Sequence, residues 1–221
     1  MSISPLAATR KTWVLVLLAA LPLATFGQTT LSARSGSKMR IEGTSNVHDW
    51  QVESPFISGS LTVGAGFPTE PGQAVQPGKI DAKADVSIAI RSLKSIEKDG
   101  KPYSDSMDEI MYDKLKVTAQ PMIRYYLTEL VLKEAPKTKD APYLFDSKGD
   151  LVVAGVTNSI SMPISIIPLG AQKLKLTGIV TLKMTDFKID PPAPKLALGL
   201  IKTGDDVKLI FEWMLAPKKK G

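Results

Sequence analysis

The sequence from Lys79 to Arg91 alternates almost strictly between apolar and polar residues, and the alternation returns in Lys173–Asp186 and Asp206–Leu215. Because successive side chains of a strand point to opposite faces, these runs predict long strands with one apolar and one polar face. Several such strands need a shared interior, which a closed sheet provides without free edges. The pattern predicts an all-β, antiparallel barrel of about eight strands, with room for side chains or one small ligand.

The first residues have the features of a secretory signal peptide. Arg10 and Lys11 precede the apolar run Trp13–Phe26, and small residues lie at its end. The run is shorter than the roughly 20 residues of a membrane span, which favours a cleaved signal peptide. An uncleaved N-terminal anchor is the alternative. We expect residues 1–27 to be the signal peptide, with Ala24 as the alternative cleavage position. The protein is then periplasmic or secreted in a bacterium.

The remainder of the chain predicts one domain. Residues 28–38 are small and polar and predict a flexible leader, residues 39–216 carry the strands, and residues 217–221 form a short basic tail. Removal of the signal peptide leaves 26 Lys+Arg against 22 Asp+Glu, a net charge of +4. Since the chain has no cysteine, an exported domain must be held together by its core.

The basic residues predict a solvated surface. Lysines lie on the polar face of the strands at Lys83, Lys173, Lys175, Lys183 and Lys208. Export and the lack of interleaved aromatic residues exclude nucleic acid as a partner. The tail lysines 218–220 predict a transient contact with an anionic membrane surface. The pattern leaves the oligomeric state open.

Nine segments have strand patterns, separated by turn residues. They are Met39–Thr44, Val47–Glu53, Ile57–Val63, Lys79–Arg91, Met122–Leu132, Leu151–Val153, Ser159–Ile166, Lys173–Asp186 and Asp206–Leu215. Gly64–Gly78 and Lys133–Asp150 contain prolines and lack periodicity, so both predict loops at the rims of the barrel.

One segment predicts a helix, Ser106 to about Lys116. Ser106 and Glu109 have the spacing of a capping box, and Met107, Ile110 and Met111 follow helical spacing. A helix this short is marginal alone and needs an apolar surface to rest on. We expect it to be a movable lid at one mouth of the barrel.

Catalytic candidates are few. His48 is the only histidine, and there is no cysteine. Its neighbour Asp49 points to the opposite face of a strand, and no nucleotide-binding or nucleophile motif occurs. We therefore predict no enzyme activity, no metal and no cofactor. His48 either fixes the first hairpin or contacts the polar end of a ligand, and a role as acid–base catalyst is the remaining alternative.

The apolar faces identify the residues expected around the interior. They are Val86, Ile88, Ile90, Ile123, Tyr125, Leu127, Met162, Ile164, Leu174, Leu176, Val180, Leu182, Met184, Val207, Leu209, Phe211 and Trp213. These residues, apart from Leu174 and Val207, form the candidate ligand-binding set with His48, Trp50, Phe187, Met107, Ile110 and Met111. Gly178 in mid-strand and the methionines favour a partly open interior over a filled core, the alternative.

Five motifs occur in order from about Met39 to Leu215. They are Ile41-Glu-Gly-Thr-Ser-Asn-Val-His-Asp-Trp50, Ser92-Leu-Lys-Ser-Ile96, Pro121-Met-Ile-Arg-Tyr125, Gly155-Val-Thr-Asn158 and Asp186-Phe-Lys-Ile189. Together they resemble the YceI-like family, exported lipid-binding proteins also called polyisoprenoid-binding domains. The Gly-Val-Thr turn is the most specific motif. Family members usually have an Arg-Asp and a His-Leu pair at the helix, and Tyr103–Met107 replaces these pairs in this chain.

The resemblance implies a lipocalin-like barrel that holds an isoprenoid chain, such as a quinone tail or a polyprenyl lipid, without enzyme activity. Burying one CH₂ contributes about 0.8 kcal/mol, so a long chain can bind without a specific polar contact. A structural or interaction barrel with a filled core and no ligand is one alternative. An enzyme acting on a bound isoprenoid through His48 is the other.

Overall fold

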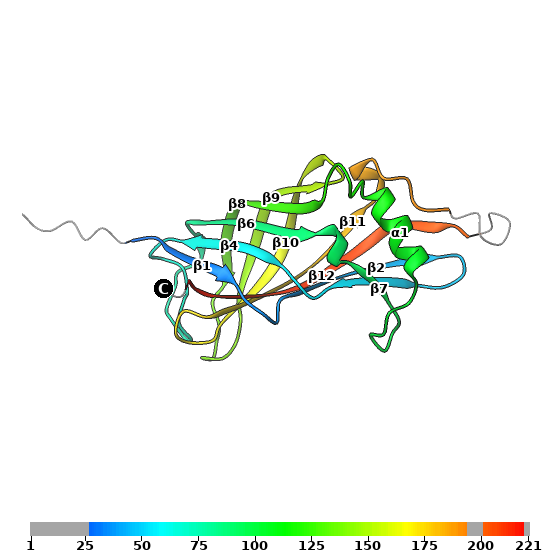
Figure 1. Ribbon diagram of the computed structural model, residues 1–221. Helices are drawn as coiled ribbons and strands as arrows, with labels where there is room; N and C mark the ends of the chain where they lie inside the picture. Colours follow the sequence, from blue (N-terminus) through cyan, green and yellow to red (C-terminus); the bar gives the residue numbers. More distant parts are fainter. Residues whose placement is uncertain (1–26, 194–200, 219–221) are drawn as a thin grey trace, which may run out of the picture.

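The computed structural model describes residues 27–193 and 201–218, so the predicted signal peptide lies outside it apart from Gly27. Eight antiparallel strands close into a barrel because β1 pairs with both β4 and β12 (Figure 1). In barrel order the strands are β1 (Thr29–Ala33), β4 (Ser58–Val63), β6 (Ala82–Ala89), β8 (Met122–Glu134), β9 (Tyr143–Val153), β10 (Val156–Pro168), β11 (Leu174–Lys183) and β12 (Thr203–Pro217). The predicted barrel is confirmed.

Three further strands extend the sheet from β12. They are β2 (Lys38–Ser45), β3 (Trp50–Ser54) and β7 (Lys94–Ile96). The extension is possible because β12 is long enough for two partners on the edge opposite β11. Its residues Leu215 to Pro217 pair with β1, while Val207 to Glu212 pair with β2. The short β5 (Gly78–Lys79) pairs with β8.

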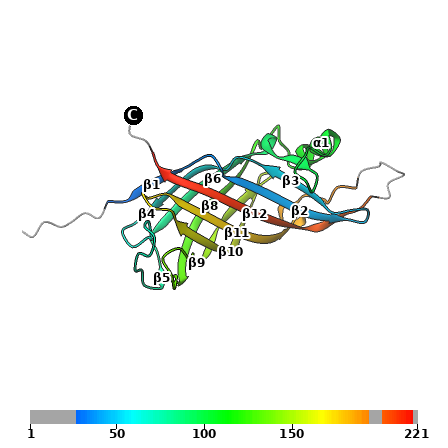
Figure 2. The same ribbon diagram turned by 90° about the horizontal axis from the view of Figure 1, so that it is seen from below.

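The single α-helix among the described residues, α1 (Asp105–Lys114), lies at one end of the barrel, whereas β1 lies toward the other (Figures 1 and 2). Aromatic side chains close that other end. The rings of Phe67 and Phe145 stack at 6.1 Å between centroids, and the hydroxyl of Tyr143 donates to the carbonyl of Gln73 at 2.5 Å. All three aromatic residues are buried. The barrel interior is therefore closed away from α1.

Two predicted irregular segments contain strands. The predicted flexible leader, residues 28–38, is wrong for Thr29–Ala33, which forms β1 and buries Leu31 completely. The predicted loop Lys133–Asp150 is also wrong, because β8 continues to Glu134 and β9 begins at Tyr143. In both cases too few apolar side chains face inward for the alternation to be read.

The predicted strand Lys79–Arg91 is interrupted. Ile80 and Asp81 separate β5 from β6 without strand geometry, and after β6 the chain forms a 3-10 helix, η1 (Ile90–Ser92). The backbone N–H of Ile90 still donates to the carbonyl of Pro121 at 2.9 Å, and η1 then carries the chain away from β8. This turn carries the chain to β7.

The helix begins earlier than its sequence predicts. Ser104 has an extended backbone, and its hydroxyl accepts a hydrogen bond from the backbone N–H of Met107 at 3.3 Å. The N-cap is therefore Ser104 and not Ser106, and Glu109 is not part of a capping box. Of the predicted basic tail, Pro217 ends β12 and Lys218 is exposed, while residues 219–221 lie outside the described residues.

Within the described part of the chain, no helix has the length and apolar character needed to span a membrane.

Candidate functional site

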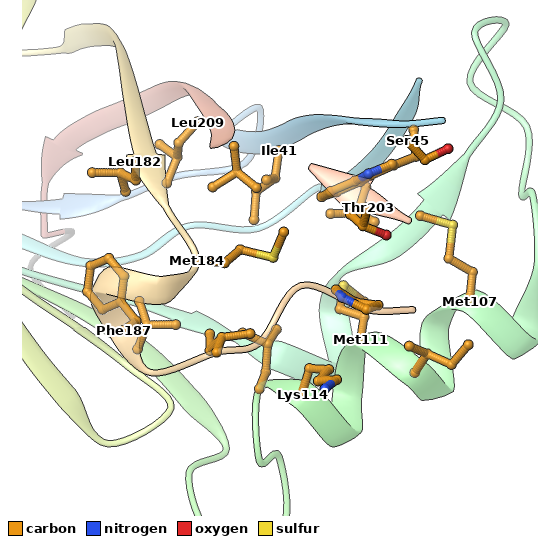
Figure 3. Close-up of a pocket in the computed structure, with 18 of the residues that line it drawn as sticks. Ile41, Ser45, Met107, Met111, Lys114, Leu182, Met184, Phe187, Thr203 and Leu209 are labelled. Atoms are coloured by element: carbon orange, nitrogen blue, oxygen red, sulfur yellow. The ribbon is translucent and has the colours of Figure 1, made fainter. Parts of the chain in front are cut away.

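A cavity of about 290 Å³, here called the outer cavity, lies between α1 and the barrel mouth. Figure 3 shows Met107 and Met111 of α1 on one side of it. Ile41 of β2, Leu182 of β11 and Leu209 of β12 lie on the barrel side. Most of the lining is apolar, although Lys114 and Lys183 also contribute to it, so the outer cavity suits a hydrocarbon.

A second cavity of about 100 Å³, the inner cavity, lies deeper in the barrel. Ile123, Leu151 and Leu209 line both cavities. The two cavities are therefore neighbours, and together we call them the lumen, which begins at α1 and extends toward the buried ring of Phe67. Such an elongated apolar space fits a chain better than a compact ligand.

The structure brings together all the predicted site residues except Ile90. The outer cavity is lined by His48, Trp50, Met107, Ile110, Met111, Ile123, Leu182, Met184, Phe187 and Leu209. The inner cavity is lined by Val86, Ile88, Ile123, Tyr125, Leu127, Met162, Ile164, Leu176, Val180, Leu209, Phe211 and Trp213. That these residues contact a ligand stays a prediction.

Ile90 does not line either cavity. It belongs to η1, where the chain has left the barrel wall, and its side chain is completely buried in the core. The alternation continues through Ile90, so period two alone could not show that the strand had ended.

Several lining residues were missed in the sequence. Leu151 and Val153 lie on β9, of which only the last residues were recognised, and Ile41 and Val52 lie on β2 and β3. The alternation in β2 is a signal that could have found Ile41. Ile189 follows η2 (Thr185–Phe187), an irregular segment without a readable period. The remaining apolar members that were missed are Leu115, Pro192, Ile201, Met39, Ile57, Leu61, Phe67, Ala84, Leu130, Ile160 and Ile166.

Glycines on the barrel wall lie beneath aromatic rings. A Cβ on Gly178 would come within 2.5 Å of the ring of Phe211, its partner across β11 and β12. A Cβ on Gly149 would likewise meet the ring of Tyr125 at 2.5 Å. Gly178 therefore does not itself contribute to the open space, because Phe211 fills the place of the missing side chain.

His48 links two segments at the rim of the outer cavity. Its Nδ1 lies 2.8 Å from the carbonyl oxygen of Asp49, and its Nε2 lies 3.1 Å from the hydroxyl of Tyr103. A carbonyl only accepts, so Nδ1 carries the proton and Nε2 of the neutral ring accepts from Tyr103. Both ring nitrogens are therefore engaged in hydrogen bonds within the protein. The arrangement favours the predicted structural role of His48.

The aromatic ring of Tyr112 anchors α1 to the segment that precedes it. The Tyr112 hydroxyl donates to the carbonyl of Leu93 at 2.8 Å, and the side chain is buried. Lys94 Nζ lies 5.5 Å from the ring centroid, and the guanidinium of Arg91 lies at the same distance. The helix is therefore fixed on this face, while its methionines line the outer cavity.

Among the described residues, no three of the types His, Cys, Asp and Glu gather where they could hold a metal ion.

The family described as YceI-like domain matches residues 36–215. The chain belongs to the YceI-like family. The resemblance predicted from the motifs is thus confirmed, and the match covers every strand of the barrel except β1 and the end of β12.

Two solved structures share the fold of this YceI-like chain. A polyisoprenoid binding domain from Saccharophagus degradans, implicated in plant cell wall breakdown, is 13% identical with a TM-score of 0.60, covering 87% of this chain and 100% of that one. BcnA of Burkholderia cenocepacia is 14% identical with a TM-score of 0.54, covering 80% of this chain and 94% of that one. A search of curated proteins gave no match.

Proposed function

We propose that this YceI-like protein is an exported, non-enzymatic binding protein that holds an isoprenoid or a similarly long apolar lipid in its barrel. The observation that carries the proposal is the lumen itself. It is apolar along its length, begins beneath α1 and is closed by Phe67 and Phe145 at the other end. The polyisoprenoid binding domain of Saccharophagus degradans, which has the same fold, supports the ligand class.

The lumen favours a carrier over a filled barrel. An outer cavity of about 290 Å³ is much larger than the voids that close-packed interiors contain. Met107, Met111 and Met184 around it are unbranched side chains that adapt to ligands of different shape. Each buried CH₂ of a lipid contributes about 0.8 kcal/mol, so a chain that fills the lumen binds without any fixed polar contact.

Among the described residues at the mouth of the lumen, no catalytic arrangement supports the enzyme alternative. His48 is exposed and both its ring nitrogens are engaged. The polar residues near it, Ser45 and Tyr103, form hydrogen bonds that hold the β2–β3 hairpin and the segment before α1. This part of the site positions backbone rather than reacting groups.

Uptake of a labelled polyprenyl quinone by the purified protein tests the proposal. Leu182→Asp places an unpaired charge in the outer cavity and is expected to abolish uptake, since a buried charge is costly. Thr181→Asp changes an exposed residue of the same strand that lines neither cavity, and it serves as the control, with uptake unchanged. Circular dichroism of both variants separates loss of binding from loss of folding. Equal uptake by the two variants would contradict the proposal.

If Leu182→Asp does not fold, Met111→Gln provides the second test. It places an uncharged polar side chain on the cavity face of α1, outside the barrel wall. We expect this variant to fold and to take up less quinone.

A further inference from the structure

Two polar atoms beside the inner cavity are buried and have no hydrogen-bond partner among the described residues, the hydroxyl of Tyr125 and the indole Nε1 of Trp213. Both side chains line the inner cavity, and Trp213 is 4% exposed. Tyr125 comes from β8 and Trp213 from β12. These strands are separated by β9, β10 and β11 on one side of the barrel and by β6, β4 and β1 on the other. The two donors therefore lie on opposite walls.

Other aromatic donors of the fold are satisfied. Trp50 Nε1 donates to the carbonyl of Thr44 at 3.1 Å, and Tyr112 donates to the carbonyl of Leu93 at 2.8 Å. A buried donor without a partner is costly, and nearly all buried polar groups in folded proteins have one. An acceptor inside the inner cavity would satisfy the two exceptions.

Tyr125 is a donor rather than an anion at neutral pH. Burial raises the pKa of its hydroxyl, an effect that the nearby Ser147 hydroxyl partly offsets. Ser147 itself donates to the carbonyl of Met162 at 2.8 Å, and neither the Tyr125 hydroxyl nor the Trp213 indole N–H has a hydrogen-bond partner among the described residues. The inner cavity thus presents two neutral donors that an acceptor on a ligand could satisfy.

The acceptor that fits is uncharged. Arg124 is the charged residue at the edge of the inner cavity, but it is exposed, and its guanidinium donates to the hydroxyl of Tyr126 at 3.3 Å. A phosphate in this cavity would lose its hydration without a buried cation to replace it. Carbonyl and ether oxygens carry no such penalty and accept hydrogen bonds from phenol and indole.

We propose that the inner cavity binds the uncharged, oxygen-bearing head of a prenylated lipid, with its carbonyl or ether oxygens accepting from Tyr125 and Trp213. The inference rests on the proposed function and adds an orientation to it. The head lies inward, and the hydrocarbon tail extends past Ile123 and Leu209 toward α1. A polyprenyl phosphate would have to keep its head outside the mouth.

Titrations with three probes test this subsite. They are a prenylated benzoquinone, the hydrocarbon squalene and a polyprenyl phosphate, each added to the wild type, Tyr125→Phe and Tyr126→Phe. We expect Tyr125→Phe to weaken benzoquinone binding about 2- to 10-fold and to leave squalene binding unchanged, because only one hydrogen bond is removed. Tyr126→Phe removes an exposed hydroxyl from the next residue and is expected to change neither.

The indole N–H of Trp213 gives a direct second readout. Its ¹H,¹⁵N resonance should move downfield when the benzoquinone binds and much less when squalene binds. A resonance that shows a hydrogen bond without any ligand, and does not respond to the benzoquinone, would mean that ordered water satisfies the donor and would overturn the subsite.

The remaining outcomes separate the two proposals. If the wild type binds benzoquinone and squalene, but Tyr125→Phe weakens neither, the subsite is wrong and the lipid carrier stands. If the polyprenyl phosphate binds, and Tyr125→Phe weakens its binding as much as that of the benzoquinone, the proposal of an uncharged head is wrong. If the wild type binds none of the three probes, the proposed function and the subsite both fail.

Discussion

The carboxylate of Asp108 in α1 accepts a hydrogen bond of 2.6 Å from the backbone N–H of Ser95 in β7. Its second oxygen lies 3.0 Å from Nζ of Lys94, and Asp108 is only 3% exposed. With the Tyr112 hydroxyl, this contact ties one face of the helix to the edge of the extended sheet. The opposite face is left to the lumen, which explains how a helix of ten residues keeps its position over an incompletely filled cavity.

Asp108→Ala is expected to lower the free energy of unfolding by about 1–3 kcal/mol, because the buried N–H of Ser95 loses its acceptor. Urea denaturation measures the loss. Glu109→Ala, at the exposed next position of the same helix, is the control and should stay within about 0.5 kcal/mol of the wild type. Equal stability of the two variants would show that the Asp108 contact does not hold the helix.

Lipid binding is expected to slow amide hydrogen exchange in residues 105–114. Met107, Ile110 and Met111 border the outer cavity, so a lipid there adds contacts to the docked helix and favours that state. Exchange mass spectrometry with and without a polyprenyl quinone measures the effect, and the β9–β10 pair provides the reference. Exchange as slow as in that pair without lipid, and unchanged by lipid, would make α1 a fixed plug. The predicted lid would then be wrong, and lipid would reach the lumen elsewhere.

Gly178→Val is expected to destabilise the barrel by about 1–3 kcal/mol, since the new side chain would occupy the space of the Phe211 ring. Thermal or urea unfolding checks the loss. Thr181→Val, on the exposed face of the same strand, is the control for the change in strand propensity. A Gly178 variant as stable as the control would mean that the Phe211 ring is free to move aside.

Glu212 on β12 is expected to add stability that depends on pH. Its carboxylate pairs with Lys175 of β11 and lies 3.3 Å from Nζ of Lys38 in β2. Lys175 is the main cause that holds the pKa of Glu212 below its ordinary value of 4.5, with burial opposing. Because the folded-state pKa is depressed, the stabilisation is complete well above pH 4.5 and is lost as pH falls through the folded-state pKa.

Glu212→Gln should accordingly be less stable than the wild type by about 0.5–1 kcal/mol at neutral pH, the range for partly exposed pairs. The difference should shrink as pH falls from 4.5 through the lower folded-state pKa, where the wild-type carboxylate becomes protonated. Urea denaturation at pH 7 and at acidic pH compares the two proteins. A difference that is the same at every pH would show that the ion pairs contribute nothing.

Where the alternation is carried by apolar side chains, it predicts the barrel well. In β11 every second residue from Leu174 faces the interior, and in β12 every second residue from Val207 does so. Leu176 and Trp213 lie opposite each other across these two strands, and both are buried. The alternation of apolar and polar residues therefore predicts both the fold and most of the residues that line the lumen. It does not reveal where a strand ends, as Ile90 shows.

The missed elements have too few inward apolar residues. β1 buries Leu31 alone among its side chains, yet its pairing with β4 and β12 closes the barrel. In β9 the inward positions Ser147 and Gly149 interrupt the apolar pattern, although Gly149 is needed there because the Tyr125 ring lies over it. Such requirements come from a partner strand and cannot be read from one segment.

Native mass spectrometry of the purified protein tests the central claim most directly. The proposed function predicts that the protein carries, or takes up from added polyprenyl quinone, one lipid per chain. Organic extraction should then release a molecule with an isoprenoid chain. Protein that is free of lipid as purified, and that stays free of lipid after incubation with quinone and polyprenyl analogues, would contradict the claim and favour a barrel that functions without a ligand.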